Sequence, residues 1–356
     1  MRVPLAEARA LATDVLIGAG VSPRHAGQQA AVLVDAEARQ VPSHGLLRLP
    51  RLVRRIAGGV ADARACGSHT WVSPTYLRVD GEQGLGPPVA LHALDAVIAA
   101  AEQNGAATAA ITGSNHLGML GYYARVVADR GLACLAMTTS EPLVHPWGGS
   151  RAMIGTNPLA IAVPAEPRPL VLDMATSMIS MGRVHDHARR GRPLDPGWAL
   201  DAEGRPTTDA TAAMDGSLSP FGGAKGYALG LALGAIVSFV TGSVPGVEVR
   251  GTLDDVNPSG KGDLFIVLKG AQRPVADFLD QIRATPPTDT DRPVTVPGDG
   301  GESRALAAEQ SGIDLDDGLW SELLALRPAP GPVAPDISGR DNGGQASKES
   351  EESCRL

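Results

Sequence analysis

The sequence predicts an α/β protein, and three observations lead to that prediction. The chain has 356 residues, which is long enough to bury a substantial core. Hydrophobic residues make up 43% of the chain and charged residues 20%, as in ordinary globular proteins. Over residues 107–138 the hydrophobic period changes from strand to helix and back to strand, which predicts a strand–helix–strand unit.

Local start and stop signals predict the elements before this unit. Residues 5–39 predict two helices, the first ended by Gly18 and Gly20. Ser22 is the expected N-cap of the second helix and Pro23 its first residue. Further predicted elements are a helix at 46–56, a strand at 75–81 and a helix at 89–103.

The second half of the chain predicts short strands at 159–163, 170–174 and 264–268. A polar loop is expected after Arg183, and it includes His185 and His187. This histidine pair is a weak metal signal without further ligands at useful spacing, so solvated loop histidines are the preferred interpretation.

The most apolar segment, Tyr227–Val240, spans about 14 residues. A bilayer requires roughly 20 residues in one helix. We therefore expect a buried helix here, not a membrane span.

Charge and composition exclude several classes of partner. The net charge is −8, the isoelectric point is near 5.5 and aromatic residues make up 3% of the chain. Nucleic acids and anionic membranes both need a basic surface, so neither is an expected partner. The N-terminal segment lacks a continuous apolar stretch, and the three cysteines form neither a CxxC pair nor a plausible disulfide framework. We expect a cytoplasmic protein that acts on a small molecule.

The first candidate site is Ser43-His44-Gly45, which is followed by Arg48 at the start of a predicted helix. An arginine there can bind a substrate carboxylate with two hydrogen bonds, while a histidine exchanges a proton. The alternative is that Ser43 only caps the helix and that residues 48–55 form a solvated basic face. The segment alone leaves both open.

The second candidate site is the segment Ser114-Asn115-His116-Leu117-Gly118, directly after a predicted strand. The ordinary pKa of histidine lies near neutrality, so His116 suits general acid–base catalysis. A hydrogen-bonded loop histidine without a catalytic role is the alternative.

The third candidate site is the glycine-rich turn at 219–226, which contains Lys225 and opens the apolar helix. Free backbone N–H groups beside a lysine can bind a phosphate or a carboxylate. A tight turn with a surface lysine explains the same residues. The turn is not a Walker A motif, and residues 81–86 have the spacing GxxGxG, so no Rossmann fingerprint is present.

Seven ordered blocks together resemble the type 2 malate/L-lactate dehydrogenase family, over most of residues 1–326. The blocks are SHGLLRLPRLVRRIAGG at 43–59, SNHLGMLGYYARVVADRGL at 114–132, MTTSEPLVHPWGG at 137–149, GTNPLAIAVP at 155–164, LDMATS at 172–177, GWALDAEGRPTTD at 197–209 and GGAKGYALGLAL at 222–233.

The resemblance implies a non-Rossmann α/β fold, with a mixed-sheet cofactor domain and a smaller helical domain. The helical part is expected at 1–75 joined by 285–326, and the cofactor- and substrate-binding domain at 76–284. It further implies a homodimer that transfers a hydride between NAD(P) and a small 2-hydroxy or 2-oxo carboxylate, of the malate, lactate, sulfolactate or ureidoglycolate type. From composition, residues 327–356 are expected to be a disordered tail.

The resemblance also implies roles for individual residues. His116 matches the catalytic base, Ser43 and His44 the pair that handles the proton, and Arg48 the residue that binds the substrate carboxylate. The residues that match cofactor contacts are Ser140, Asp173, Met174, Ala175 and Lys225. No metal ion is expected.

Glu141 follows Ser140 and could accept hydrogen bonds from ribose hydroxyls while repelling a 2′-phosphate. We therefore expect NAD, with NADP as the alternative.

Three positions depart from the family pattern. Leu52 replaces a frequent aromatic residue, so an apolar wall is expected opposite the distal group of the substrate. The segment 180–183 differs from the usual small residue followed by Arg-Gly-Lys, and Ser219 replaces an apolar residue.

Three other functions stay open. Some members of this family reduce cyclic imino acids, and a cofactor-binding homologue without activity is also compatible with these departures. A metal-dependent hydrolase using His44, His116, His145 and Asp173 is a rival of another class, although these residues form no compact ligand motif.

Overall fold

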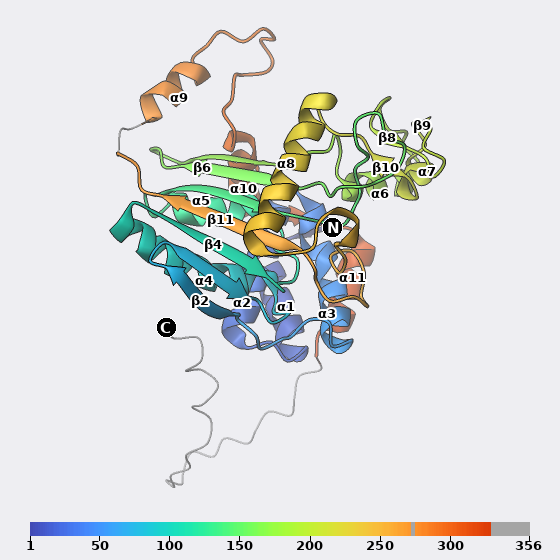
Figure 1. The fold of residues 1–356 in the computed structure, drawn as a ribbon. Helices are drawn as coiled ribbons and strands as arrows, with labels where there is room; N and C mark the ends of the chain where they lie inside the picture. Colours follow the sequence, from blue (N-terminus) through green and yellow to red (C-terminus); the bar gives the residue numbers. More distant parts are fainter. Residues whose placement is uncertain (272–274, 329–356) are drawn as a thin grey trace.

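The computed structural model describes residues 1–271 and 275–328. Its largest sheet has seven strands in the order β2-β3-β4-β11-β5-β6-β7, in which β3 and β4 are parallel and the other pairs are antiparallel. Figure 1 shows this sheet crossing the molecule. Its strands are β2 (Ser68–Ser73), β3 (Tyr76–Asp80), β4 (Ala106–Thr112), β5 (Ala133–Thr138), β6 (Leu159–Val163), β7 (Leu170–Met174) and β11 (Gly262–Leu268).

The strand–helix–strand unit is confirmed, with one insertion. Helix α5 (Leu120–Ala128) connects β4 to β5 as predicted. The two strands are not neighbours, because β11 lies between them and is antiparallel to both. Phe265 of β11 faces Ala109 on one side and Ala136 on the other.

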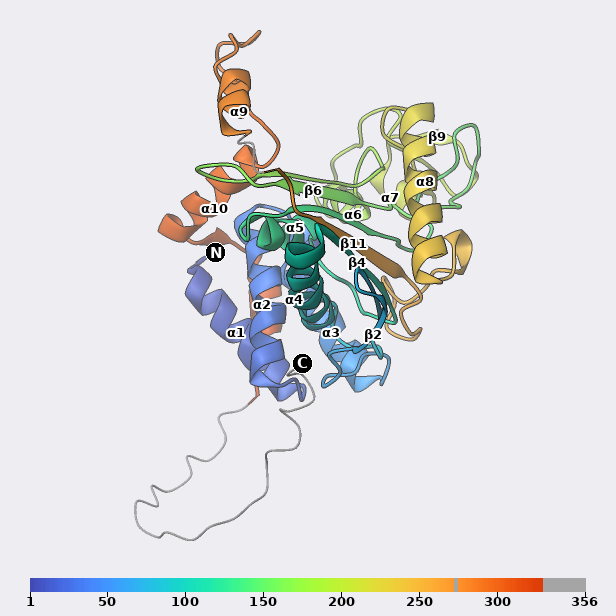
Figure 2. The ribbon, with the colours of Figure 1, turned by 60° about the vertical axis from the view of Figure 1, so that its left-hand side comes forward.

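The two faces of the sheet are covered by different helices. Alternate residues of a strand point to opposite faces, and accordingly Ile111 packs with α4 (Gly86–Asn104) and α5, whereas Ala110 packs with α8 (Ala224–Thr241). Figure 2 shows α4 and α5 on one side of the sheet and α8 on the other. The helices predicted before the unit are confirmed as well, and Ser22 accepts the N-capping hydrogen bond from His25.

The prediction that the apolar segment is a buried helix is wrong. Helix α8 has 18 residues, and only a narrow stripe of it is buried against the sheet: Gly226, Gly230, Leu233 and Val237. Large apolar side chains on its other faces are exposed, most of all Phe239 at 89%. By length and composition alone α8 could cross a membrane, with 22% of its residues buried. The prediction rested on the apolar composition and length of the segment, and a helix that is apolar on all sides gives no indication of which face is covered.

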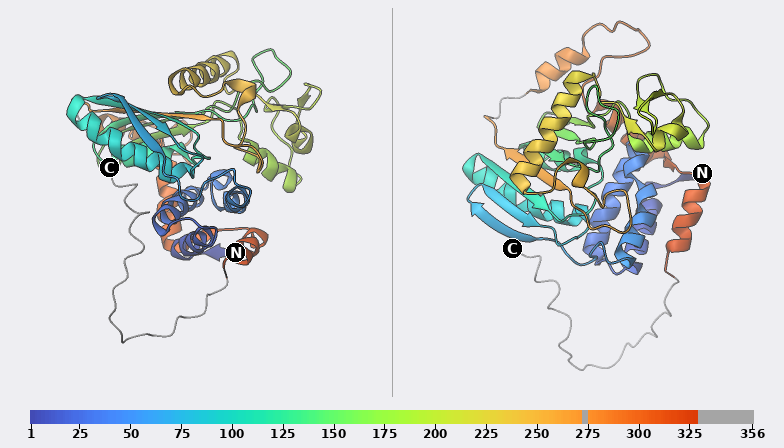
Figure 3. Two further views of the ribbon diagram at one scale, coloured as in Figure 1. Left: turned by 60° about the horizontal axis from the view of Figure 1, so that its bottom comes forward. Right: turned by 45° about the vertical axis from the view of Figure 1, so that its right-hand side comes forward.

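The N-terminal helices form a second core together with C-terminal elements. Trp320 and Leu323 pack in one cluster with Leu16 and Leu33. Figure 3 shows the N-terminal helices, coloured blue, beside the red C-terminal ones. The domain boundaries expected at 75 and 285 stay a prediction. The elements are β1 (Arg2–Val3), α1 (Leu5–Gly18), α2 (Pro23–Ala38), η1 (Pro42–His44), η2 (Leu46–Arg48), α3 (Leu49–Ala57), α10 (Asp299–Ser311), β12 (Ile313–Asp314) and α11 (Asp317–Leu326).

Residues 181–218 form a small lobe whose apolar cluster also includes Val144, Ile154 and Ile179. The polar loop predicted after Arg183 is partly wrong, because α6 (Met181–Arg189) carries both His185 and His187. The side chain of Ser180 caps this helix by accepting a hydrogen bond from the Arg183 amide. The remaining elements are β8 (Ala199–Leu200), β9 (Pro206–Thr207), α7 (Ala210–Met214), β10 (Ser217–Leu218), η3 (Gly246–Glu248) and α9 (Ala276–Arg283).

Cys134 is a buried free cysteine, but Cys66 is disulfide-bonded, so the expectation of no disulfide is wrong at Cys66. From residue 329 onward, the tail expected at 327–356 lies outside the described residues.

Candidate active site

Two short 3-10 turns, η1 and η2, present Ser43, His44 and Arg48. Gly45 separates the turns, and a Cβ atom there would collide with the carboxylate of Glu37. Oε1 of Glu37 accepts a 2.8 Å hydrogen bond from the Leu46 amide, and burial raises the pKa of this carboxyl to about 7. A buried acceptor on α2 therefore fixes the path of the chain between the two turns.

Arg48 is half-buried, and its guanidinium is hydrogen-bonded within the protein. Its Nε donates a 2.7 Å hydrogen bond to the backbone oxygen of Ser43, and burial lowers its pKa to about 10. Ser43 caps no helix; its hydroxyl instead lies 2.9 Å from Nδ1 of His44. Arg55, farther along the basic run, is 3% exposed. The alternative of a solvated face is wrong for these two arginines.

His44 and His116 come together although they are far apart in sequence. Their ring centroids are 5.4 Å apart, with 27° between the ring planes. Burial, followed by the positive charge of Arg48, lowers the pKa of both rings, that of His44 to about 4 and that of His116 well below its usual value. Both imidazoles are therefore neutral at pH 7.

The hydrogen bonds of the rings limit their tautomers. Nδ1 of His116 accepts a 3.1 Å hydrogen bond from the Gly118 amide. In the neutral ring the proton is then on Nε2, which can donate a hydrogen bond to a substrate oxygen. Nδ1 of His44 can donate to Ser43 or accept from it, and in the first case Nε2 of His44 is a free proton acceptor.

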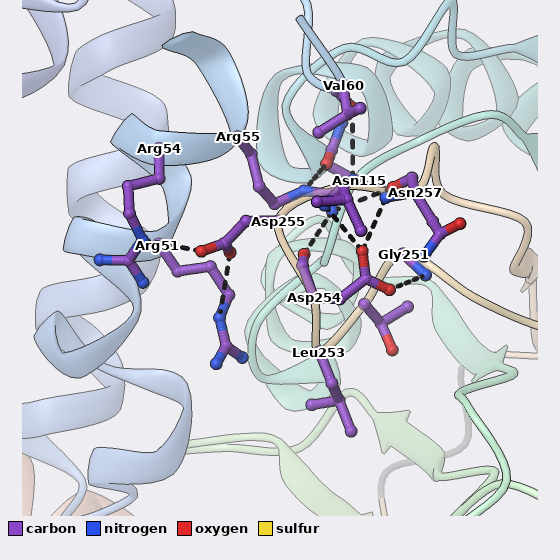
Figure 4. A network of polar contacts seen from close by, with 12 residues as sticks. Arg51, Arg54, Arg55, Val60, Asn115, Gly251, Leu253, Asp254, Asp255 and Asn257 are labelled. Carbon is purple, nitrogen blue, oxygen red and sulfur yellow. Dashed lines mark hydrogen bonds and ion pairs between the residues drawn. The ribbon is translucent and has the colours of Figure 1, made fainter. Parts of the chain in front are cut away.

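Asn115 and Arg55 join the loop of His116 to helix α3 (Figure 4). Nε of Arg55 donates a 2.8 Å hydrogen bond to Oδ1 of Asn115. The other nitrogens of the guanidinium donate to backbone oxygens of Val60, Asp254 and Asn257. The sequence analysis missed Arg55, although its position seven residues after Arg48 places both on one side of a helix.

Ser114, on the other side of Asn115, is bonded to a buried ion pair at the start of β11. Nζ of Lys261 lies 2.5 Å from Asp263 and 2.9 Å from the hydroxyl of Ser114, which donates to Asp263. Lys261 and Asp263 directly precede the predicted apolar strand 264–268. Two charged residues at this place were a sequence signal for the ion pair, but the sequence analysis did not use them.

A small cavity of about 20 Å³ lies at the centre of this arrangement. It holds roughly one water molecule, so a substrate must displace some of the lining side chains. Leu52 lines the cavity, in agreement with the expected apolar wall. The polar side chains of Arg51 and Gln29 line the cavity as well. The lining residues are Gln29, Leu33, Arg48, Arg51, Leu52, Arg55, Asn115, His116, Gly118 and Thr252.

The expected cofactor contacts lie around larger cavities. Asp173, at the end of β7, lines a cavity of about 460 Å³ and accepts a 2.6 Å hydrogen bond from the Gly121 amide. Val41 lines this cavity and also a neighbouring one of about 570 Å³, which Ser43 lines. The two cavities therefore adjoin near the candidate catalytic residues.

Thr156 connects the segments that carry other expected cofactor contacts. The amide of Thr156 donates to the hydroxyl of Ser140, and its carbonyl accepts from Thr176, directly after Met174 and Ala175. Lys225 is exposed at the start of α8 and lines none of the three cavities described above.

The carboxylate of Glu141 is hydrogen-bonded to a loop of the protein, whereas a cofactor ribose was its expected partner. Its Oε1 accepts hydrogen bonds of 2.7 Å from the amides of Thr252 and Leu253. Glu141 thereby holds a loop that contributes Thr252 to the small cavity. This contact places Glu141 near the small cavity, so the structure does not support a role for Glu141 in selecting NAD.

The described part of the chain contains no group of three or more His, Cys, Asp or Glu side chains arranged to hold a metal ion. His145, one of the residues of the hydrolase alternative, lies near the hydroxyl of Ser219 and the carbonyl of Pro146. The rings of His44 and His116 stack on each other, and His145 is not part of this pair.

A mixed α/β sheet without a Rossmann fingerprint carries two neutral imidazoles beside a half-buried guanidinium, an arrangement that can bind a carboxylate and exchange a proton. Residues 3–324 match the family model described as malate/L-lactate dehydrogenase, and the chain belongs to this family of NAD(P)-dependent 2-hydroxyacid dehydrogenases.

Individual relatives agree with this assignment. The (2R)-3-sulfolactate dehydrogenase (NADP(+)) of Chromohalobacter salexigens is 39% identical over 68% of this chain and 72% of its own. The Δ1-pyrroline-2-carboxylate reductase of Ancylobacter novellus is 34% identical over 92% and 98%. The crystal structure of a dehydrogenase from Sinorhizobium meliloti has a TM-score of 0.90 at 47% identity, covering 92% and 98%.

Proposed function

We propose that this protein transfers a hydride between NAD(P) and C2 of a small 2-hydroxy or 2-oxo carboxylate. The observation that carries the proposal is the position of the Arg48 guanidinium beside the paired rings of His44 and His116. Arg48 would bind the carboxylate of the substrate, and a charge-assisted pair of this kind fixes both position and orientation.

The two imidazoles would handle the proton of the substrate hydroxyl. We assign His116 as the group that contacts the substrate oxygen, because it lines the small cavity with Arg48 and its Nε2 carries the donor proton. The base role that the resemblance implies for His116 does not fit this tautomer, so we assign that role to His44. His44, whose Nε2 is free to accept a proton when its Nδ1 donates to Ser43, would take the proton of the hydroxyl. Removal of one such group typically lowers the rate about 10²- to 10⁴-fold.

The adjoining cavities fit a dinucleotide in size and chemistry. The larger volumes of 460 and 570 Å³ lie in the range of ordinary cofactor pockets. Asp173 is exposed in one of them and could accept hydrogen bonds from ribose hydroxyls, and Arg168 and Arg304 line the same cavity and could bind phosphate. The nicotinamide supplies or accepts the hydride when bound.

Between the two nicotinamide cofactors we propose NAD, with Asp173 as the residue that binds the ribose. An acidic residue at that position disfavours a 2′-phosphate. Comparison of kcat/KM for NAD and NADP tests this choice, and equal or better use of NADP would refute it.

Cyclic imino acid reduction is the second candidate function, because one relative with this activity in its name covers nearly the whole chain. Absorbance of NAD(P)H followed against 2-hydroxy acids, 2-oxo acids and cyclic imines separates the two. Turnover of 2-oxo acids supports the first candidate, exclusive turnover of imines supports the second, and binding of NADH without turnover identifies an inactive homologue.

We also propose that the protein is a cytoplasmic homodimer and that the exposed apolar face of α8 contacts the second copy. This face comprises Leu229, Leu231, Ile236 and Phe239. The buried stripe of α8 packs on the sheet, which argues against a helix surrounded by lipid. Exposed apolar patches on such a scale mark protein contacts.

A further inference from the structure

The start of strand β11 carries two charged side chains that are enclosed by the protein. Lys261 is 2% exposed and Asp263 is 0% exposed. Nζ of Lys261 lies 2.6 and 2.5 Å from the two oxygens of the Asp263 carboxylate. Apolar residues of similar volume often stabilise a protein core as well as such a pair does, so stability alone does not account for it. The role of the pair follows from the groups that it contacts.

The central place of β11 in the sheet brings this pair to the ends of two other strands. β11 lies between β4 and β5, and Asp263 is the register partner of Thr138, the last residue of β5. The hydroxyl of Thr138 donates a 2.5 Å hydrogen bond to Oδ1 of Asp263. Ser114, which lies just beyond β4, donates a 2.6 Å hydrogen bond to Oδ2 of the same carboxylate and accepts one of 2.9 Å from Lys261. One ion pair therefore joins the ends of β4 and β5.

The segments that leave these two strand ends line the small cavity. The segment after β4 contributes Asn115 and His116 to the lining. The segment after β5 contains Glu141, which accepts a 2.7 Å hydrogen bond from the amide of Thr252. Thr252 is itself a lining residue. Two parts of the cavity wall are therefore attached to the same buried ion pair, one directly and the other through Glu141.

The charge of Lys261 also acts on His116. Burial lowers the pKa of the His116 imidazole most, the charge of Arg48 comes next, and the charge of Lys261 contributes as well. The neutral ring, with its proton on Nε2, is the form that can donate a hydrogen bond to a substrate oxygen. Lys261 therefore favours the form of His116 that the proposed function requires.

We propose that Lys261 and Asp263 are positioning residues for hydride transfer, which hold the segments of His116 and Thr252 in place around the substrate; this inference rests on the proposed dehydrogenase function. Neither charged residue lines the cavity, so both act through the hydroxyls of Ser114 and Thr138. A displacement of a catalytic group by about 1 Å can lower a rate on the order of 100-fold, even when the altered residue is remote from the reacting atoms.

The test separates a positioning role from a purely structural one in the full-length enzyme. Ser114→Ala and Thr138→Val each remove one attachment and keep both charges, whereas the double variant Lys261→Met/Asp263→Leu removes the whole pair. Thr138→Ser keeps the hydroxyl at its position. Ser217→Ala is the matched control, because this buried serine of β10 has no hydrogen-bond partner for its hydroxyl among the residues described.

Two kinds of measurement are made on each variant. Steady-state kinetics give kcat and the KM values for cofactor and substrate, with the best substrate among lactate, malate and 3-sulfolactate. The same substrate deuterated at C2 gives the isotope effect on kcat. Circular dichroism and thermal melting verify that each variant is folded.

We expect kcat to fall about 10- to 100-fold in Ser114→Ala and in the apolar double variant, while KM for the cofactor stays near that of the wild type. The isotope effect on kcat should rise, because hydride transfer then limits turnover more than product release does. Thr138→Val should lose activity in the same way, and Thr138→Ser should keep most of it. Ser217→Ala should match the wild type.

A double variant that melts like the wild type and retains its kcat overturns the inference, because the pair would then be structural only. An equal loss of kcat in Ser217→Ala overturns it as well. If the double variant does not fold, Ser114→Ala and the contrast between Thr138→Val and Thr138→Ser decide, since these variants keep the ion pair. Absence of turnover by the wild type with every 2-hydroxy and 2-oxo acid would instead contradict the proposed function itself.

Discussion

Nε of Arg55 lies 2.8 Å from Oδ1 of Asn115, so helix α3 is hydrogen-bonded to the loop that carries His116. The turn leading into α3 carries Arg48. Arg48, proposed to bind the carboxylate, and His116, proposed to contact the substrate oxygen, are thereby held at a fixed separation, and Asn115 is the point of attachment.

Replacement of Arg55 by lysine should therefore impair catalysis more than binding. The lysine keeps the charge but cannot reach Asn115 and the backbone oxygens of Asp254 and Asn257 together. We expect kcat to fall about 10- to 100-fold, the effect of a small misplacement of a catalytic group. Steady-state kinetics measure the change. The double variant with Asn115→Ala should lose little beyond the single ones, and fully additive losses would contradict the coupling.

Replacement of His116 by alanine should lower kcat for oxidation by about 10² to 10³, because the hydrogen-bond donor to the substrate oxygen is gone. His187→Ala is a suitable control, since His187 lies on α6 and its Nδ1 contacts the carbonyl of Pro193. Turnover of His116→Ala close to that of the wild type would show that His116 does not contact the substrate oxygen. His44→Ala removes the proposed base and should lower kcat about 10²- to 10⁴-fold.

The pH profile should reflect two imidazoles whose pKa values are lowered by burial. Oxidation requires a neutral ring, and the pKa of His44 is about 4 while that of His116 lies well below its usual value. We expect kcat/KM to stay constant from pH 8 to about 6 and to fall only as the pH drops through these lowered values.

Stability must be measured alongside the pH profile. Below the ordinary histidine pKa the unfolded chain binds protons that the buried rings do not, so the free energy of unfolding also decreases. Circular dichroism at each pH separates unfolding from titration of the site. A decline of kcat/KM centred near pH 6.5 or above, in a folded protein, would contradict neutral rings.

Removal of one partner of the buried pair Lys261–Asp263 should destabilise the protein strongly. Lys261→Met leaves the carboxylate of Asp263 buried and without its cation, which typically costs about 3–5 kcal/mol. Urea denaturation measures the loss. The double variant with Asp263→Leu should regain most of it, and a single variant that loses less than about 1 kcal/mol would show that the charge is compensated elsewhere.

Introduction of a charge at Phe239 should dissociate the proposed dimer. This side chain is 89% exposed on α8, and a buried unpaired carboxylate at an interface is strongly unfavourable. We expect Phe239→Glu to shift the sedimentation coefficient from that of a dimer to that of a monomer. Leu324→Glu, at an exposed apolar position on α11, should leave the assembly unchanged. A wild type that sediments as a monomer would refute the proposal.

Sequence patterns predicted the helices and strands well where the signal is local. Ser22 capped α2 as expected, and the periodicity of residues 107–138 gave β4, α5 and β5. The same reasoning failed for α8, because an apolar helix gives no indication of which face will be covered. It also missed Arg55 and Lys261, whose partners come from distant segments.

The sequence by itself determined the local elements, the acidic charge balance and the residue types of the site, because caps, turns and hydrophobic period depend on neighbouring residues. Only the tertiary structure decided that β11 separates β4 from β5, that His44 faces His116, and that Glu141 holds the loop at Thr252. These relationships depend on contacts between segments far apart in the chain, and no local pattern encodes their distances.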